Sequence, residues 1–137
     1  MHDLQAVLTL PQEAMYLALG DHLARRRDAV GLHRLTTIER TLWLAREFHW
    51  TVRQNGLLGY MLGVTRGIAH ETQVALASIG AAYTATVLRD AIAAHENAVV
   101  HFFEAPRLSD EVEDIPSLIC QYARANRDEL LVTGVTA

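Results

Sequence analysis

The chain has 137 residues, a length that suits one domain, and half of its residues are hydrophobic, which disfavours disorder. Its net charge of −4 disfavours general binding to nucleic acid, because phosphate backbones select basic surfaces. With the single cysteine Cys120 no internal disulfide can form, the start has no basic signal region, and no apolar run approaches the ~20 residues of a membrane span. We therefore expect a cytoplasmic protein with one helical domain over residues 1–137.

Apolar residues at helical spacing dominate the first half of the chain. Residues 10–26 open with a proline and a glutamate, which suit the first turn of a helix, and then place apolar side chains four apart. Residues 35–52 repeat apolar side chains at threes and fours, and Trp50 widens that face. Either Thr36 or Thr37 is suited to cap this helix. We predict that it is the central helix of the core.

Four glycines follow within residues 54–67, spaced three or four apart: Gly56, Gly59, Gly63 and Gly67. No Gly-Lys-Ser/Thr follows them, which excludes a P-loop, and no credible strand precedes them to form a dinucleotide fingerprint. Asn55 and Gly56 form a strong turn pair. We predict that Asn55 ends one helix in a left-handed conformation and that Gly56 lets the chain start the next. The glycines would then form a face for close backbone packing.

The second half of the chain also has a helical pattern. A helix is predicted through residues 70–80 with Gly80 as its stop, and another over residues 83–103. Residues 104–116 have the composition of a solvated connection, and residues 117–131 carry an apolar stripe typical of a closing helix. Period-two alternation is scarce. We therefore predict an all-α fold, an irregular bundle of about five or six helices.

The side chains form no recognisable catalytic or metal-binding motif. The seven histidines include no HExxH and no two residues three or four apart, and His49 lies on the core face of its helix, where a hydrogen-bonded interior histidine is the simpler interpretation. Cys120 lies on the apolar stripe of the last helix, where a buried thiol is inert without a neighbouring base. We predict no catalytic residue, no metal and no cofactor. A metal-dependent or other enzyme in a helical cleft is kept as an alternative.

Charge is distributed unevenly along the chain. Residues 25–53 hold seven arginines and three acids, and the simplest interpretation of their first three arginines is a solvated helix end. Residues 104–137 hold seven acids and three arginines. Acidic loops are usually only solvated, but carboxylates can also occupy positions where a partner expects phosphates. We take four of these acids as the candidate partner-binding site: Asp110, Glu111, Glu113 and Asp114.

The stretch "NGLLGYMLGVTRG", followed by "ETQVALASIGAAYTATVLRDAI", resembles a bacterial family of helical proteins of largely unknown function. That family has an Asn-Gly-Gly-Phe-x-Gln-Tyr-Phe motif, a small-residue turn and a helix ending near Ile-Gly-Ala. Asn55, Gly56 and Gly67 keep family residues, and the spacing to Gly80 matches, whereas residues 57–62 replace the rest of the motif. The resemblance spans about residues 38–131.

The best-studied type in that family is described as a DNA mimic, a dimeric acidic protein that binds a DNA-binding regulator in place of DNA. The resemblance therefore implies a homodimer and a non-enzymatic protein-binding module, with a DNA-mimic-like inhibitor of a DNA-binding regulator as the specific form. Direct binding to nucleic acid or membrane is not expected.

Two alternatives stay open: an immunity-type protein that neutralises a toxin, and a subunit of a larger assembly. In the second case surplus apolar surface, including Tyr60, Met61 and Leu62, would form the oligomer face.

Overall fold

The computed structural model describes residues 3–96 and 108–136, and within them every regular element is a helix. The prediction of an all-α bundle is therefore confirmed. The elements are α1 (Leu4–Val7), α2 (Gln12–Val30), the 3₁₀ helix η1 (Leu32–Arg34), α3 (Thr37–Gly63), α4 (Arg66–Ser78), α5 (Ala82–Glu96), α6 (Ile115–Ala125) and α7 (Arg127–Thr136). Within these ranges, no helix combines the length and apolar character needed to cross a membrane.

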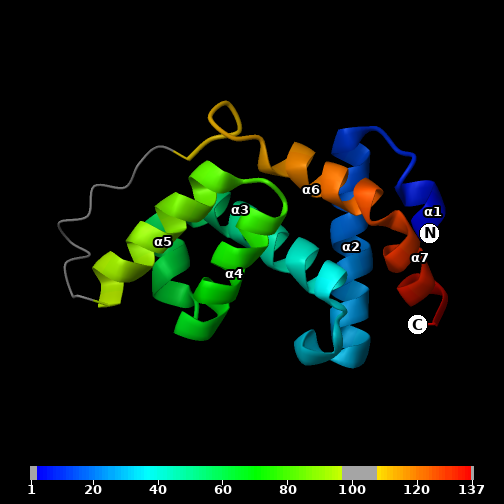
Figure 1. The fold of residues 1–137 in the computed structure, drawn as a ribbon, viewed down its shortest axis with the longest axis horizontal. Coiled ribbons are helices and arrows are strands. Elements are labelled where there is room, and N and C mark those ends of the chain that lie inside the picture. The colour runs from blue at the N-terminus through cyan, green and yellow to red at the C-terminus, as the bar shows by residue number, and fades with distance from the viewer. Residues whose placement is uncertain (1–2, 97–107, 137) are drawn as a thin grey trace.

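The centre of the molecule is α3, which contacts α2, α4, α5, α6 and α7. In Figure 1, α4 and α5 lie on one side of α3, while α1, α2 and α7 lie on the other. Each of these helices contributes to one cluster of buried apolar side chains, whose fully buried members include Leu19, Leu23, Leu42, Leu76, Leu88, Ile119 and Leu130. The prediction of a central core helix is confirmed, because α3 supplies buried side chains along most of its length.

A reciprocal cap starts α3. The Thr36 hydroxyl accepts a hydrogen bond from the backbone N–H of Glu39 (3.2 Å), and the Glu39 carboxylate accepts one from the backbone N–H of Thr36 (3.0 Å). This capping box satisfies two backbone donors that no helical partner could reach. The sequence left Thr36 and Thr37 open as the cap, and the structure selects Thr36.

Gly56 breaks the direction of α3. Its backbone angles, φ 76° and ψ 173°, belong to a region that is essentially open only to glycine, and Gly56 is the one residue within α3 with non-helical angles. The predicted turn at Asn55 and Gly56 is therefore confirmed. The prediction that Asn55 adopts the left-handed conformation was wrong, because the glycine beside it takes the strained position at lower steric cost.

The prediction of a glycine packing face was also wrong. A Cβ built on Gly56, Gly63 or Gly67 meets nothing within 4 Å. One built on Gly59 meets only the Asn55 side chain of its own helix. The break at Gly56 and the start of α4 before Gly67 mean that the four glycines do not share one helix. A Cβ on Gly59 would lie 2.6 Å from Cβ of Asn55, and a Cβ on Gly20 in α2 would lie 2.6 Å from Nε of Arg46 on α3.

Gly80 ends α4 as predicted. With φ 91°, it allows two hydrogen bonds that return to the last turn, from Gly80 N–H to the Ala77 carbonyl (3.1 Å) and from Ala81 N–H to the Leu76 carbonyl (2.8 Å). These bonds satisfy carbonyls that the helix itself leaves unpaired. At the other end of α4, Thr65 accepts a hydrogen bond from Ile68 N–H (3.3 Å) and caps the helix just before Gly67.

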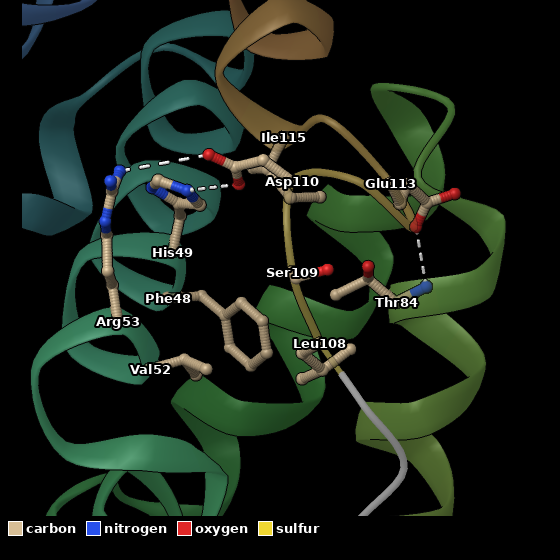
Figure 2. A pocket seen from close by; sticks show the side chains of 10 residues that line it. All are labelled: Phe48, His49, Val52, Arg53, Thr84, Leu108, Ser109, Asp110, Glu113 and Ile115. Carbon is tan, nitrogen blue, oxygen red and sulfur yellow. Dashed lines mark hydrogen bonds and ion pairs between the residues drawn. The ribbon is translucent and has the colours of Figure 1, made fainter.

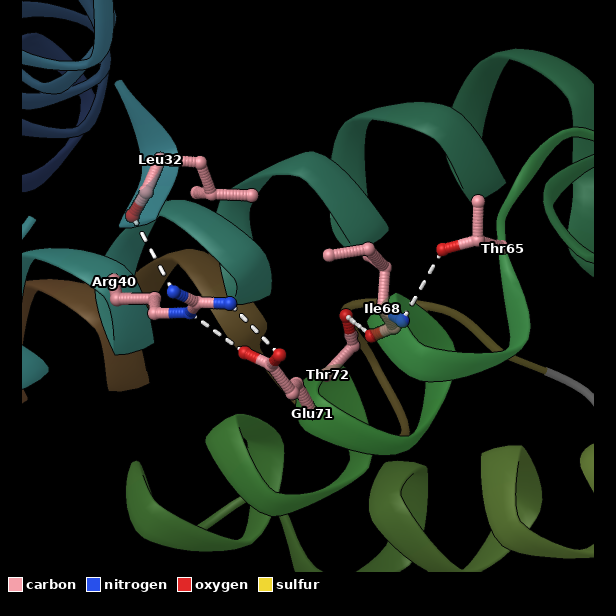
Figure 3. Close-up of polar contacts among 6 residues, drawn as sticks. All are labelled: Leu32, Arg40, Thr65, Ile68, Glu71 and Thr72. Carbon is pink, nitrogen blue, oxygen red and sulfur yellow. Dashed lines mark hydrogen bonds and ion pairs between the residues drawn. The ribbon is translucent and has the colours of Figure 1, made fainter. Parts of the chain in front are cut away.

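Arg40 connects three elements (Figure 3). From α3 it donates two hydrogen bonds to the Glu71 carboxylate on α4, at 2.6 and 2.7 Å, and a longer one of 3.4 Å to the Leu32 carbonyl in η1. This two-point arginine–carboxylate contact fixes direction as well as distance. It holds η1 and α4 against the first half of α3.

Two predicted helices have different limits in the structure. The closing helix predicted over residues 117–131 begins earlier and is divided at Asn126 into α6 and α7. Asn126 leaves helical angles, and its side-chain amide donates to the Tyr122 carbonyl at 2.8 Å. Of the helix predicted over residues 83–103, α5 accounts for the part up to Glu96, and residues 97–103 lie outside the described residues. Residues 108–114 form a non-helical connection, as predicted.

Candidate functional site

The predicted partner-binding acids lie in the connection that leads into α6, and Asp110 lies against α3 (Figure 2). Its Oδ1 atom lies 3.0 Å from Nε2 of His49, and its Oδ2 atom lies 3.8 Å from a terminal nitrogen of Arg53. Both partners come from the middle turns of α3, one turn apart. Asp110 therefore attaches residues 108–114, which we call the acidic segment, to the central helix.

His49 is the middle member of a three-residue chain. Its Nδ1 atom lies 2.9 Å from the Tyr16 hydroxyl on α2, and its Nε2 atom contacts Asp110. The histidine side chain is 8% exposed, and burial raises the pKa of Tyr16 to about 12. The predicted hydrogen-bonded interior histidine is confirmed. The hydrogen bonds of these three side chains connect α2, α3 and the acidic segment, and each of the three groups has a partner.

Glu113 points to α5 (Figure 2). Its two carboxylate oxygens accept hydrogen bonds from the backbone N–H groups of Thr84 (2.7 Å) and Tyr83 (3.3 Å). These groups lie in the first turn of α5, where backbone donors lack helical partners and a negative charge is favourable. Glu113 thus caps a helix that begins about thirty residues before it.

Asp114 caps α6, because its Oδ1 atom accepts a hydrogen bond from Ser117 N–H at 3.1 Å. Asp110, Glu111 and Asp114 are exposed, whereas Glu113 is partly buried. Asp110 and Asp114 therefore lie at the surface around the start of α6, whereas Glu113 is used to cap α5. The four acids do not form one cluster of equivalent carboxylates.

Two hollows lie on either side of His49. One, of about 340 Å³, lies between α3 and the start of α5, and its wall includes Phe48, Val52, Thr84 and Ile115 (Figure 2). The other, of about 470 Å³, lies between α2, α3 and the start of α6. We call this second hollow the acidic groove. It is lined by Gln12, Glu13, Tyr16, Leu17, His49, Trp50, Arg53, Asp110, Asp114 and Pro116.

The acidic groove combines charge with exposed apolar surface. Glu13, Asp110 and Asp114 contribute three carboxylates and Arg53 one guanidinium, so negative charge prevails. Leu17 and Trp50 add large apolar side chains that are 54% and 43% exposed. Exposed apolar surface with a polar rim is typical of a binding site.

Sequence reasoning missed the α2 and α3 contributions to this groove. Trp50 was assigned to the core face, which is wrong, because the indole lies at the surface beside Arg46, whose guanidinium carbon is 5.5 Å from the ring centroid. Glu13 was interpreted only as a first-turn acid. Its proximity to Asp114 depends on the packing of α2 against α6, about a hundred residues later in the chain.

The apolar face predicted for assembly is smaller than expected. Tyr60 and Met61 are buried in the core, whereas Leu62 is exposed, together with Leu58 one turn before it. Leu58 and Leu62 lie four residues apart on the outer face of α3, whereas Leu57, Tyr60 and Met61 lie on its inner face. A homodimer stays a prediction.

Within the described ranges the side chains that can ligate a metal are dispersed, and the single cysteine is buried. Between residues 3 and 96 and between 108 and 136, no group of three or more His, Cys, Asp or Glu side chains could hold a metal ion. Cys120 is buried, its Sγ atom lies 3.7 Å from the Gln12 carbonyl, and burial raises the pKa of the thiol to about 11. Such a thiol is a poor nucleophile. The absence of enzymatic activity remains a prediction.

Comparison with known families gives one assignment. Residues 33–130 match the model of the DMP19-like protein family, so the chain belongs to that family. The match covers most of the chain and includes α3 to α6 and the acidic segment. Neither a curated protein nor a solved structure matches the chain. Membership agrees with the resemblance stated above and fits a non-enzymatic protein-binding role.

Proposed function

We propose that the protein is a non-enzymatic binding module that docks a basic DNA-binding protein, in the manner of a DNA mimic, through the acidic surface around the start of α6. One observation carries the proposal. Carboxylates from two distant segments, Glu13 on α2 and Asp110 and Asp114 before α6, share one groove with exposed Leu17 and Trp50. Family membership supports the same role.

The arrangement suits a basic partner for two physical reasons. Several like charges on one face accelerate encounter with an oppositely charged surface, and apolar contact then slows dissociation. Three of the seven arginines between residues 25 and 53, Arg26, Arg40 and Arg46, each contact a carboxylate and lie partly buried.

The test is affinity capture from native lysate with the full chain as bait and mass spectrometry as the readout. The matched variant replaces Asp110 and Asp114 by Asn and Glu111 by Gln. It removes three charges and keeps an amide oxygen for the His49 contact and the α6 cap. Glu113 stays unchanged because it caps α5.

We expect the chain to capture a DNA-binding protein that duplex DNA releases, and we expect the variant and higher salt to weaken capture. Capture that is equal for both baits rejects the acidic surface. A captured protein that binds DNA and the chain at the same time rejects DNA mimicry.

A further inference from the structure

We propose that the acidic groove is a socket that binds an arginine side chain of the partner. In the free protein, the Arg53 side chain occupies part of this socket. The existence of a protein partner rests on the function proposed above. The chemistry of the socket rests on the residues that line it.

The groove offers an indole wall. Trp50 is 43% exposed, and Arg46 lies over its ring, with the guanidinium carbon 5.5 Å from the ring centroid. The chain repeats this contact at the buried Trp43, where the guanidinium carbon of Arg27 lies 4.6 Å from the ring centroid. Indole faces attract guanidinium groups, and the exposed part of Trp50 can receive another one. Leu17 supplies apolar surface for the methylene stem of such a side chain.

The groove also offers uncompensated negative charge. Glu13 on α2 and Asp114 before α6 line it. The positive charge in the groove is that of Arg53, which lies beside the Asp110 carboxylate. That contact is long, at 3.8 Å, and the Arg53 side chain is 66% exposed. Exposed ion pairs of this kind are weak, so an incoming guanidinium can displace it. The position of Arg53 shows that a guanidinium group fits against Asp110.

Arginine suits the groove better than lysine. A guanidinium is planar, stacks on aromatic faces, is weakly hydrated and can contact a carboxylate at two points. An ammonium is a compact and strongly hydrated point charge, and it would gain less from Trp50. The socket therefore selects arginine among basic side chains.

The test uses the full chain and the peptide acetyl-Leu-Arg-Leu-amide, with matched peptides that carry Lys or citrulline in the middle. The readout is the indole N–H signal of Trp50 in ¹H–¹⁵N spectra. The chain has two tryptophans, so buried Trp43 serves as the control within each spectrum. We expect the arginine peptide to give a saturable shift at Trp50 that exceeds any shift at Trp43. The lysine peptide should bind more weakly, and the neutral citrulline peptide should not bind.

Two variants should act in opposite directions. Glu13→Gln removes an attracting charge and should weaken binding of the arginine peptide about two- to fivefold, whereas Arg53→Gln removes the competing guanidinium and should strengthen it by a similar factor. Asp21→Asn removes an exposed charge from the same helix but outside the groove, and it should leave binding unchanged.

Absence of a saturable Trp50 shift, equal shifts from the arginine and citrulline peptides, or weaker binding by the Arg53→Gln variant overturns the proposal. The lysate experiment separates this failure from that of the proposed function. If the chain captures a DNA-binding protein and Glu13→Gln captures it equally, the socket is wrong and the proposed function stands.

Discussion

Arg26 and Glu39 form an ion pair across the corner between α2 and α3, with Arg26 Nε 2.8 Å from Glu39 Oε2. The Glu39 side chain is 0% exposed, and its carboxylate also completes the cap of α3. Burial acts to raise the pKa of Glu39, but the hydrogen bonds from Arg26 and Thr36 outweigh it and hold the pKa below its usual value. One carboxylate thus orients two helices.

Loss of this carboxylate should destabilise the fold strongly. We expect Glu39→Ala to lower the free energy of unfolding by about 3–5 kcal/mol, because Arg26 is left without its partner in a mostly buried place. Urea denaturation followed by circular dichroism measures this loss. Asp28→Ala, which breaks the exposed pair of Arg27 and Asp28, is the control and should change the free energy by less than about 1 kcal/mol. Similar effects of the two changes would contradict the buried pair.

Glu39 should also make the free energy of unfolding depend on pH in the acid range. Because the pKa of Glu39 is lower in the folded protein, the unfolded chain takes up the proton first as pH falls. The stabilisation is therefore fully present above the unfolded pKa of about 4.3 and is lost as pH falls through the lower folded pKa. Urea midpoints measured from pH 7 to acid should show this loss for the wild type. Glu39→Gln should have a flatter profile, and an unchanged profile would refute the assignment.

Gly56 should tolerate no side chain. We expect Gly56→Ala to lower the free energy of unfolding by about 1–3 kcal/mol, because its backbone angles are essentially restricted to glycine. Gly67→Ala is the matched control, since Gly67 lies in α4 with open space at the Cβ position. That change should be neutral or stabilising by up to about 1 kcal/mol. Equal destabilisation by both changes would mean that glycine packing, not the turn, is important here.

Glu113 should affect stability more than partner binding. Its carboxylate caps α5, so Glu113→Ala should cost about 0.5–2 kcal/mol in urea denaturation, the usual cost of losing a helix cap. At temperatures where the variant is fully folded, capture of the partner should equal that of the wild type. Asp114→Asn, which keeps a cap at α6 but removes a charge from the acidic groove, should show the opposite pattern. If Glu113→Ala lost capture of the partner while fully folded, Glu113 would be part of the binding surface after all.

The thiol of Cys120 should be inert in the native protein. Because the thiol is buried and its pKa is raised to about 11, almost no thiolate is present or accessible near neutral pH. Mass spectrometry after treatment with iodoacetamide should find no alkylation without denaturant and complete alkylation in urea. Rapid native alkylation would show that the last helices open readily.

Local signals in the sequence predicted the fold well. A cap at Thr36 or Thr37, the turn at Asn55 and Gly56 and the stop at Gly80 each depend on residues within a few positions of each other. All three features appear in the structure, with Thr36 as the cap. The spacing of apolar residues predicted the central helix for the same reason. The glycine packing face failed because helical spacing has no meaning across the break that Gly56 itself creates.

The site depended on contacts that no local pattern encodes. The carboxylates at positions 110–114 looked equivalent in the sequence, but Glu113 meets the first turn of α5 and Asp110 meets His49. Glu13 and Trp50 join the acidic groove only because α2 and α6 pack together beside α3. Contacts between segments this far apart follow from the packing of the whole bundle, which the order of residues does not reveal directly.

Three hydrogen-bonded side chains hold the acidic segment in place. Asp110 contacts α3, Glu113 contacts the start of α5, and Asp114 contacts the start of α6. A segment held in this way has already lost most of its conformational entropy, so a partner gives up little affinity to order it. The same anchoring divides the segment into two kinds of position. Val112, which is exposed, can be substituted without loss of an anchor, whereas substitution at an anchoring acid changes the folded frame as well.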